Sequence, residues 1–355
     1  MAYEGARSIV GPYLRHLDAM LVIAAAVSVG DLVSYTARLL GGLVVHAIST
    51  SRAYWGMVIL GYVINLAAVP LLALAGSWEA AFALVIVERM GKGLRAPARD
   101  TILAEVSQGI GRGLAFSLHE VLDQAGAVAG PLVVGLVASR EGYGFREAFL
   151  ALAAPALVAV TLLLVAYSLY PQVESAKRGP GGGGRLPRGF TLIAASGFLA
   201  MAGFVHWVQA SYRLAHLGLG GVAYLYSLAM LVDALSALAL GVLYDRAGPS
   251  TVAIVPVAAG LATALLWYGS PLAFAVAWGV AMGGFESVYR SLVADSLDPG
   301  SRGLGFGVAY FSMGVGWSVG NLLISAIDSA ALPLVALLEA GALALILAYS
   351  RGRRP

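Results

Sequence analysis

Cysteine is absent from the 355-residue sequence, which excludes disulfides, thiolate metal sites and a thiol nucleophile. Charge is scarce: 12% of the residues are charged, whereas a soluble domain typically has about 25%. Hydrophobic residues make up 59% of the chain, and its mean hydropathy is +0.84. This composition excludes an ordinary soluble enzyme, a disordered protein and a nucleic-acid binder. It predicts a chain whose solvent is the lipid bilayer.

Long apolar stretches fill most of the sequence. A membrane-spanning helix needs about 20 apolar residues and a loop adds roughly 5–10, so the chain has room for about eleven to thirteen crossings. Continuous stretches favour helices, which satisfy their own backbone hydrogen bonds in hydrocarbon. We predict an all-α polytopic membrane protein with eleven full spans, at residues 18–47, 54–76, 79–99, 111–138, 145–170, 189–214, 218–244, 250–268, 270–293, 302–327 and 331–350.

One sizeable polar segment, 171–189, interrupts the apolar spans. Its four consecutive glycines and four basic residues are typical of a flexible linker; they are Gly181 to Gly184, Lys177, Arg178, Arg185 and Arg188. The sequence thus predicts an N-terminal helical bundle at 1–170, a cytoplasmic linker at 171–189, a C-terminal helical bundle at 190–350 and a basic tail at 351–355.

The two predicted bundles repeat one another at an offset of 190 residues. The pentapeptide that starts at Arg112 recurs, with one substitution, at Arg302. Gly126 and Gly130 recur as Gly316 and Gly320 at the same offset. Half-chain repeats are typical of secondary transporters, in which two bundles rock about a site near the bilayer midplane.

Basic residues crowd the loops on one predicted side of the membrane. The positive-inside rule makes this side cytoplasmic, which places the linker and the C-terminus in the cytoplasm and the protein in the cell membrane. The loop residues on this side are Arg52, Lys92, Arg95, Arg99, Arg112, Arg246, Arg290 and Arg302, against Arg15, Arg140, Arg146 and Arg213 on the other.

Several short motifs resemble those of the Major Facilitator Superfamily. The stretch from Gly241 to Gly248, with Asp245 and Arg246, is similar to the signature that this family places between the second and third helices of each half. Its first-half counterpart departs from the pattern, with His46 where the family has aspartate.

Two further motifs resemble helix signatures of the same family. The stretch from Arg89 to Gly93 is similar to the fourth-helix signature, whose arginine the family links to proton coupling, although Lys92 replaces the usual glutamine. Gly126, Gly130 and Pro131 are similar to the fifth-helix signature of antiporters. We favour packing alone for these glycines, since they permit close helix approach, and a hinge or antiport role is the alternative. The resemblance implies twelve helices, alternating access and no cofactor.

The first helix is expected to be incomplete. Aligning His16 with His216, a weaker repeat, places the start of the first helix about ten residues before Met1. Residues 2–14 cover only about 20 Å, against a hydrocarbon thickness of about 30 Å. The sequence therefore predicts either a misplaced start or a truncated chain.

Ionisable side chains inside apolar spans are costly and mark candidate functional residues. Glu4 and Arg7, three residues apart, can pair on one helix face or line a cavity. Asp31 and Arg38 also share a face, and Asp31 is expected near the outer end, where water solvates it.

His119 and Asp123 lie one turn apart, with Asp123 about 16 Å from the cytoplasmic end of its span and so near the midplane. A buried carboxylate beside a histidine is a candidate protonation switch. The alternatives are an ion pair of Asp123 with Arg89 or Arg38, or a metal site, which would need further ligands that the sequence does not specify.

Polar residues in three other spans complete the candidates. A charged patch that includes Lys92, Arg95, Arg99 and Asp100 is expected to set the topology and to close an inner gate by salt bridges. His206, Gln209 and Arg213 have helical spacing on one span, and Glu286 and Arg290 are expected to pair.

We predict a secondary transporter of a small solute, with proton-coupled export favoured. Facilitated diffusion, import and an inactive remnant are the alternatives, and the motifs of membrane enzymes are absent. The predicted partners are the bilayer, the solute and H⁺, with no cofactor, metal or nucleic acid, for a monomer. Predicted substrate or coupling residues are Glu4, Arg7, Arg38, Arg89, His119, Asp123, His206 and Gln209; predicted gating or structural residues are Lys92, Gly93, Arg95, Arg99, Asp100, Gly126, Gly130, Pro131, Asp245 and Arg246.

Overall fold

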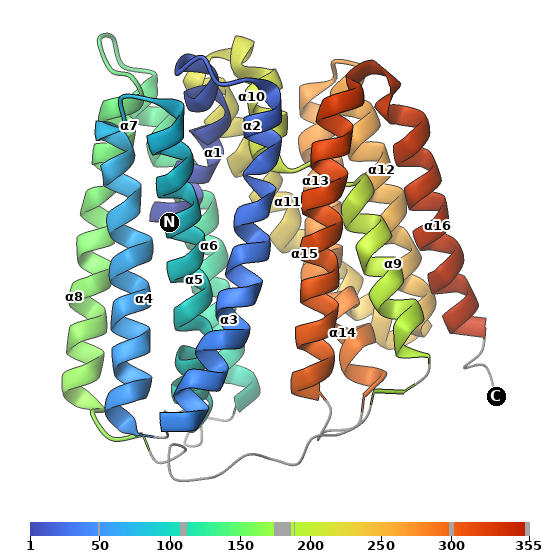
Figure 1. Ribbon diagram of the computed structural model, residues 1–355, viewed down its shortest axis with the longest axis horizontal. Helices are drawn as coiled ribbons and strands as arrows, with labels where there is room; N and C mark the ends of the chain where they lie inside the picture. Colours follow the sequence, from blue (N-terminus) through green and yellow to red (C-terminus); the bar gives the residue numbers. More distant parts are fainter. Residues whose placement is uncertain (49, 107–111, 174–185, 188, 298–301, 352–355) are drawn as a thin grey trace.

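The computed structural model describes residues 1–48, 50–106, 112–173, 186–187, 189–297 and 302–351. Every regular element in these ranges is a helix, and the helices stand side by side in two groups, one from each half of the chain (Figure 1). The first group contains α1 (Ala2–His16), α2 (Leu21–Ala26), α3 (Ser28–Ile48), α4 (Ser51–Leu71), η1 (Leu72–Leu74), α5 (Trp78–Val106), α6 (Arg112–Ala138), α7 (Phe145–Ala151) and α8 (Ala153–Leu169). The second contains α9 (Phe190–Gly203), α10 (Trp207–Arg213), η4 (Leu214–Leu217), α11 (Gly218–Ala247), η5 (Gly248–Ala253), α12 (Ile254–Trp267), α13 (Pro271–Glu286), α14 (Val288–Asp295), α15 (Arg302–Ile327), η7 (Asp328–Ala330) and α16 (Ala331–Arg351).

The protein is all-helical, as predicted, and rich in apolar helices. Seven stretches of the described residues are long and apolar enough to cross a membrane, and one of them, Phe190–Trp267, contains α9 to α12. Leu122–Ala138 is a shorter apolar helix. α5 is not among the seven because its charged residues, from Glu88 to Asp100, lower its hydropathy. The count of eleven full spans stays a prediction.

Four spans that we expected to be continuous are interrupted, one of them at Leu152, between α7 and α8. The first breaks at Val27, between α2 and α3, and another breaks at Ser287, between α13 and α14. At both places a serine hydroxyl bonds to a carbonyl of the preceding turn, Ser28 to Ala25 at 2.7 Å and Ser287 to Gly283 at 2.5 Å. Such bonds compete with the helical ladder and bend helices. The fourth break, between α9 and α10, positions the candidate site.

Each half has its own hydrophobic core. The core of the first half includes Ile9, Phe149 and Leu152, whereas the larger core of the second half includes Trp207 and Trp278. The halves meet mainly along α1 and α10, α3 and α15, and α6 and α11. Polar residues of these three helix pairs therefore lie at the interface between the two halves.

The repeated glycines have equivalent neighbours in the two halves. Gly126 and Gly130 of α6 pack against the backbone of α1, and Gly316 and Gly320 of α15 pack against the backbone of α9. A β-carbon at any of the four would overlap main-chain atoms of the facing helix. These glycines, four residues apart, thus have the packing role typical of small residues between membrane helices. Pro131 lies inside α6, directly after the second of them.

Candidate functional site

The break between α9 and α10 lies inside the second half. α9 ends at Gly203, Phe204 is extended (φ −91°, ψ 116°), and α10 begins at Trp207. The residues Phe204 to His206, called the break below, leave backbone groups that a lipid environment cannot satisfy. The expected continuous span 189–214 is therefore wrong, and other side chains must provide these hydrogen bonds.

Residues of α12 and α13 supply the first of these hydrogen bonds. The Thr263 hydroxyl donates to Gly203 O at 2.9 Å and accepts from Val205 N at 3.1 Å. The Trp278 indole N–H donates to Val205 O at 3.1 Å. Two buried side chains thus bond to Gly203, at the end of α9, and to Val205, inside the break.

Residues of α15 supply the rest. Asn321 accepts from His206 N at 2.7 Å and donates to Phe204 O at 3.1 Å. The Trp317 indole N–H donates to the same Phe204 carbonyl at 2.9 Å. Because these hydrogen-bond partners are buried side chains, they hold the break in one defined conformation.

His206 forms the end of the break and caps α10. Its Nδ1 accepts from Val208 N at 3.2 Å, so the proton of the neutral ring is on Nε2. Nε2 therefore donates to Asp31 Oδ2, which lies 3.0 Å away on α3. The histidine is completely buried, and this hydrogen bond connects the two halves of the chain.

Asp31 lies among positive charges. Its Oδ2 is 3.9 Å from Arg7 Nη2, and its Oδ1 is 3.7 Å from Arg89 Nε. The expectation that water solvates Asp31 is wrong, since the residue is only 8% exposed. The start of α3 is covered by α15, where Ser318 donates to Ser28 O at 3.2 Å.

Glu4 connects three helices. Its expected pair with Arg7 is present, with 3.9 Å between Oε1 and Nη1. Lys92 Nζ of α5 lies 3.8 Å from the same oxygen, and Tyr226 of α11 donates to Oε2 at 2.5 Å. Through Tyr226 the carboxylate also contacts the second half of the chain.

Two adjacent residues of α5 extend the arrangement. Glu88 Oε2 lies 3.2 Å from Arg89 Nε, and Glu88 accepts a hydrogen bond from the Asn65 amide of α4. Arg89 is 1% exposed. A charge so deeply buried requires compensation by neighbouring opposite charges.

Together these groups form the central charge cluster, which we define as Glu4, Arg7, Asp31, Glu88, Arg89, Lys92 and His206. Its three carboxylates balance its three cations when His206 is neutral. Some buried polar atoms nevertheless have no hydrogen-bond partner among the described residues: Arg7 Nε, Arg89 Nη1 and both amide atoms of Gln209 on α10. Unsatisfied buried groups of this kind point to water or a ligand.

Other predicted residues lie beside the cluster rather than in it. Arg38 does not pair with Asp31 in the described structure; its guanidinium lies over the Tyr310 ring of α15, at 5.8 Å. Arg95 lies over Tyr62 at 4.0 Å. Both are cation–π contacts, which leave the charge unneutralised.

Further along α5 and α11, the remaining motif residues are nearer the surface or in helix contacts. Arg99 pairs with Asp100 at 2.7 Å, and Asp100 is partly exposed. Gly93 packs against α3, where a β-carbon would lie 2.9 Å from that of Ala37. Asp245 and Arg246 are exposed in the last turn of α11.

The expected burial of Asp123 is wrong. Its side chain is exposed, and the side chain of its predicted partner His119 lies outside the described residues. Gly126, three residues further on α6 and on nearly the same face, packs against Met1. Asp123 therefore lies beyond the contact between α6 and α1.

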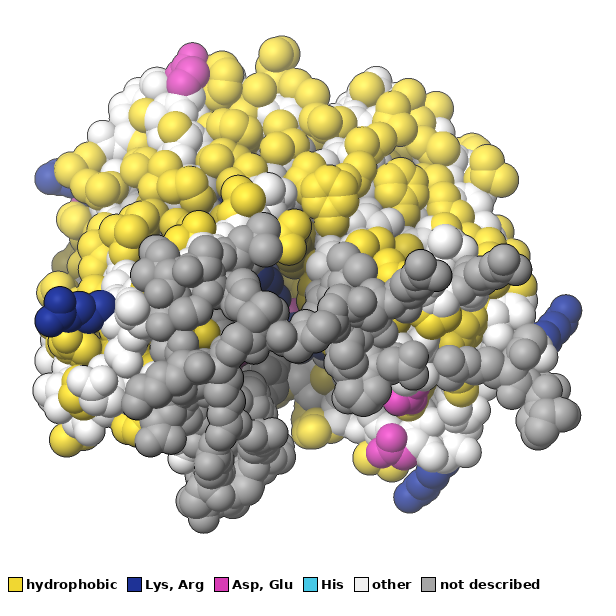
Figure 2. Space-filling view, turned by 60° about the horizontal axis from the view of Figure 1, so that its bottom comes forward, with side chains coloured by type: hydrophobic (Ala, Val, Ile, Leu, Met, Phe, Trp, Pro, Cys, Tyr) yellow, Lys and Arg dark blue, Asp and Glu magenta, His cyan; other side chains and the backbone are white. Residues whose placement is uncertain are grey.

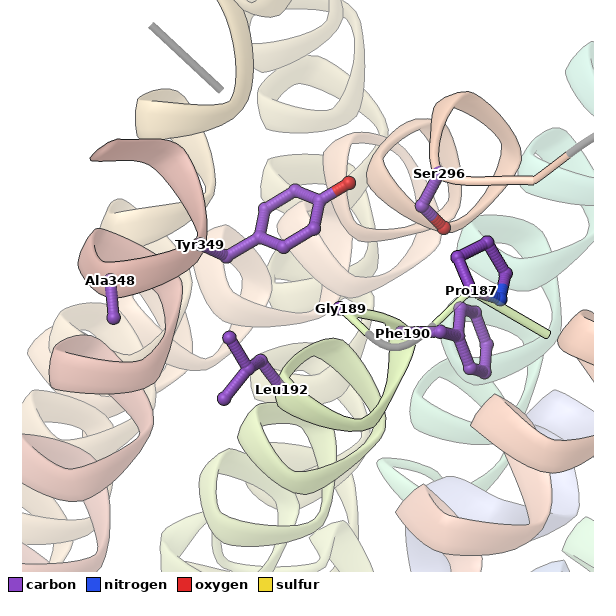
Figure 3. Close-up of a pocket in the computed structure, with 7 residues that line it drawn as sticks. All are labelled: Pro187, Gly189, Phe190, Leu192, Ser296, Ala348 and Tyr349. Atoms are coloured by element: carbon purple, nitrogen blue, oxygen red, sulfur yellow. The ribbon is translucent and has the colours of Figure 1, made fainter. Parts of the chain in front are cut away.

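A recess opens between the two halves at the end of the molecule that carries the start of α4 and the end of α14. Figure 2, which turns this end forward, shows the recess at its centre, with basic and acidic side chains visible in its depth. A separate cavity of about 300 Å³ lies at the same end of the second half (Figure 3), lined by Pro187, Gly189, Phe190, Leu192, Ser296, Ala348 and Tyr349. No predicted substrate residue lines that cavity.

Sequence reasoning missed several residues of the site and its surroundings. Asn65 and Asn321 make specific buried hydrogen bonds, and Glu339 of α16 is 6% exposed. The sequence could have indicated Glu339, because it is the one charged residue in the expected span 331–350. Among the described residues, no group of three or more His, Cys, Asp and Glu could hold a metal ion.

The sequence profile of the Major Facilitator Superfamily matches residues 6–321. The uncharacterised protein Rv2265 of Mycobacterium tuberculosis is 35% identical over 339 residues, which cover 91% of this chain and 82% of that protein. The uncharacterised MFS-type transporter MJ1317 of Methanocaldococcus jannaschii is 32% identical over 123 residues, 34% of this chain and 30% of that protein.

Solved structures of transporters have the same fold. A mutant of the nucleoside transporter NupG superposes with a TM-score of 0.77 at 14% identity, over 99% of this chain and 96% of that one. A POT family transporter in complex with a thioalcohol-conjugated peptide superposes with a TM-score of 0.73 at 15% identity, over 98% and 92% of the two chains.

Proposed function

Because the chain belongs to the Major Facilitator Superfamily and is a membrane transporter rather than an enzyme, we propose that it couples protons to the movement of a small organic solute. The two helical bundles, 1–170 and 190–350, alternate the access of a site between them. The central charge cluster is that site. The observation that carries the proposal is the hydrogen bond from His206 to Asp31, which connects the halves inside a buried group of charges.

Protonation of this pair would change the connection between the halves. Nδ1 of His206 accepts from Val208 N, so a second proton on the ring would break the cap of α10. A proton on Asp31 would cancel the attraction of this carboxylate for Arg7 and Arg89. Ionisable groups inside membrane helices commonly serve as proton relays. Asp31 is thus the proposed coupling carboxylate, and His206 is the group through which it acts on the second half.

The proposed solute carries a carboxylate or another anionic group. Arg7 and Arg89 keep buried donor atoms without partners among the described residues, and the Gln209 amide offers further unused donors and acceptors. An anionic solute would accept from these donors and compete with Asp31 for the arginines. Of the solute classes that the structural neighbours transport, a peptide-like solute with a carboxylate fits these groups better than an uncharged nucleoside.

The proposed direction is export across the cell membrane, with the C-terminus and the linker in the cytoplasm. The recess in Figure 2 would then open to the cytoplasm. The charged residues Lys92 to Asp100 close the inner end in the opposite state. Import and facilitated diffusion are the alternatives, and a monomer is sufficient for the mechanism.

The test uses purified protein in proteoliposomes. A thermal-shift screen of small organic acids and peptides identifies a ligand, because binding to the folded state raises its stability. We expect the Asp31→Asn variant to lose accumulation driven by a pH gradient while it keeps exchange of solute across the membrane. Asp18→Asn, which removes an exposed carboxylate between α1 and α2, is the matched control. Unchanged gradient-driven accumulation in Asp31→Asn would contradict the proposal.

Asp123, with His119, is the second candidate for proton coupling. The same assay separates it from Asp31. If Asp123 carries the coupling, Asp123→Asn abolishes proton-driven exchange with expression intact. Full activity of this variant would remove it as a candidate.

A further inference from the structure

One buried carboxylate lies far from the central charge cluster. Glu339 is eight residues into α16, about 12 Å along the helix axis from its start. The residue is 6% exposed, and both carboxyl oxygens are inaccessible. Neither oxygen has a hydrogen-bond partner among the residues that the structure describes.

Two glycines of the facing helices create the space for this side chain. A β-carbon at Gly260 of α12 would lie 3.1 Å from Glu339 Cγ, and one at Gly203 of α9 would overlap Glu339 Oε1. Gly203 is the last residue of α9, where the break begins. The carboxyl group is therefore packed directly against the end of the interrupted helix.

No charge faces Glu339 from the helices that cover it. α9 and α12 contain no Asp, Glu, Lys, Arg, His or Tyr, and neither does η5. Of the other elements packed on α16, α15 contributes Arg302 and Tyr310, and η7 contributes Asp328. On α16 itself, Tyr349 and Arg351 lie ten and twelve residues further on, the latter about 18 Å along the axis.

An ionised carboxylate in these surroundings would be a buried charge without compensation. The free-energy cost of such a charge is so large that the group keeps its proton instead. Glu339 is therefore neutral in this conformation. It can ionise only when water or a cation reaches it, which requires α16 to separate from Gly203 or Gly260.

We propose that Glu339 is a proton-binding site of the second half, and that its proton is bound while α16 packs against the break and is released when this contact opens. Opening the contact also disturbs the hydrogen bond from Thr263 to Gly203, and with it the segment that holds His206. The site goes beyond the proposed function, because it needs neither the solute nor the central charge cluster.

The first test measures the proton directly. Infrared spectra of the purified protein in D₂O contain the C=O band of a protonated carboxylic acid, distinct from the bands of carboxylates. We expect such a band at neutral pH in the wild type and in Glu79→Gln, which removes an exposed glutamate at the start of α5, and its loss in Glu339→Gln. An identical band in Glu339→Gln and the wild type would overturn the proposal.

The second test follows the break itself. Hydrogen exchange of the amides of Val205 and His206 is measured against pH and normalised to the unstructured rate. We expect protection in the wild type to fall several-fold at alkaline pH and to stay constant in Glu339→Gln, whose amide cannot ionise. The same fall in both proteins would overturn the link between Glu339 and the break. If Glu339→Gln does not fold, the alkaline loss of the acid band in the wild type, together with the loss of protection, carries the test, and its absence overturns the proposal.

Discussion

The imidazole of His206 donates to the carboxylate of Asp31 across 3.0 Å, although the two residues are 175 positions apart. His206 belongs to the interrupted helix of the second half, and Asp31 belongs to α3 of the first. Like the hydrogen bond from Tyr226 to Glu4, this one joins titratable side chains of the two halves. A change in the protonation of either residue would therefore alter a hydrogen bond that joins the two halves.

Replacing Asp31 should destabilise the protein. Asp31→Asn leaves Arg7 and Arg89 with one negative neighbour fewer, and breaking a buried ion pair costs about 3 kcal/mol. Asp100→Asn, at a partly exposed pair, should cost less than about 1 kcal/mol. Denaturant unfolding in detergent gives both values. Equal losses in the two variants would contradict the assigned role of Asp31.

Two substitutions of His206 separate its cap from its contact with the other half. His206→Asn keeps an acceptor for Val208 N but is too short to reach Asp31, and His206→Ala loses both. We expect His206→Ala to be less stable than His206→Asn by about 1 kcal/mol, the typical value of a helix cap.

Both variants should weaken the contact between the two halves to the same extent, because both lose the hydrogen bond to Asp31. The absence of cysteine allows spin labels at Ser77 and Tyr268, exposed residues of different halves, after their replacement by cysteine. We expect the distance distribution to broaden equally in His206→Asn and His206→Ala. A distribution identical to that of the parent would show that the hydrogen bond does not hold the halves together.

The repeated glycines should be equally intolerant of a side chain. Gly130→Ala and Gly320→Ala place a β-carbon against main-chain atoms of α1 and α9, and such overpacking costs about 1–3 kcal/mol. Gly56→Ala of α4, with no atom within 4 Å of the added carbon, should stabilise the protein by up to about 1 kcal/mol. Thermal unfolding of the three variants checks the order. A neutral Gly130→Ala variant would be inconsistent with the close approach of α6 and α1.

Thr263 should contribute more to stability than its size indicates. Thr263→Val removes the donor to Gly203 O and the acceptor for Val205 N, which leaves buried groups unsatisfied at a cost of about 1–3 kcal/mol. In Thr161→Val of α8 only an exposed bond within the same helix is lost, so we expect a change within about 0.5 kcal/mol. The free energies of unfolding of the two variants test this prediction. Similar losses in both would show that the break does not depend on Thr263.

Features that depend on local sequence could be predicted. Composition indicated an all-helical membrane protein, and the three-residue spacing of Glu4 and Arg7 predicted their pair. The constant offset predicted that the glycine pairs are equivalent, and they have equivalent neighbours in the two halves.

Features that depend on distant helices could not be predicted. Nothing in the residues from Gly203 to His206 prevents a helix, and the break exists because Thr263, Trp278, Trp317 and Asn321 bond to its main chain. Asp31 looked accessible because its position was measured along one helix, whereas side chains of other elements, Arg7, Arg89 and His206, surround it. Asp123 was expected to be buried for the same reason. The contact of its helix, α6, is instead made by Gly126, three residues further along.

Trp278 and Trp317, two of the six tryptophans of the chain, each donate an indole N–H to a carbonyl of the break. Indole emission is sensitive to hydrogen bonding and to the polarity around the ring. The natural fluorescence of the protein should therefore change when the interrupted helix rearranges, with no label attached. Stopped-flow measurements of that emission would give the rate of the rearrangement before any transported solute is identified.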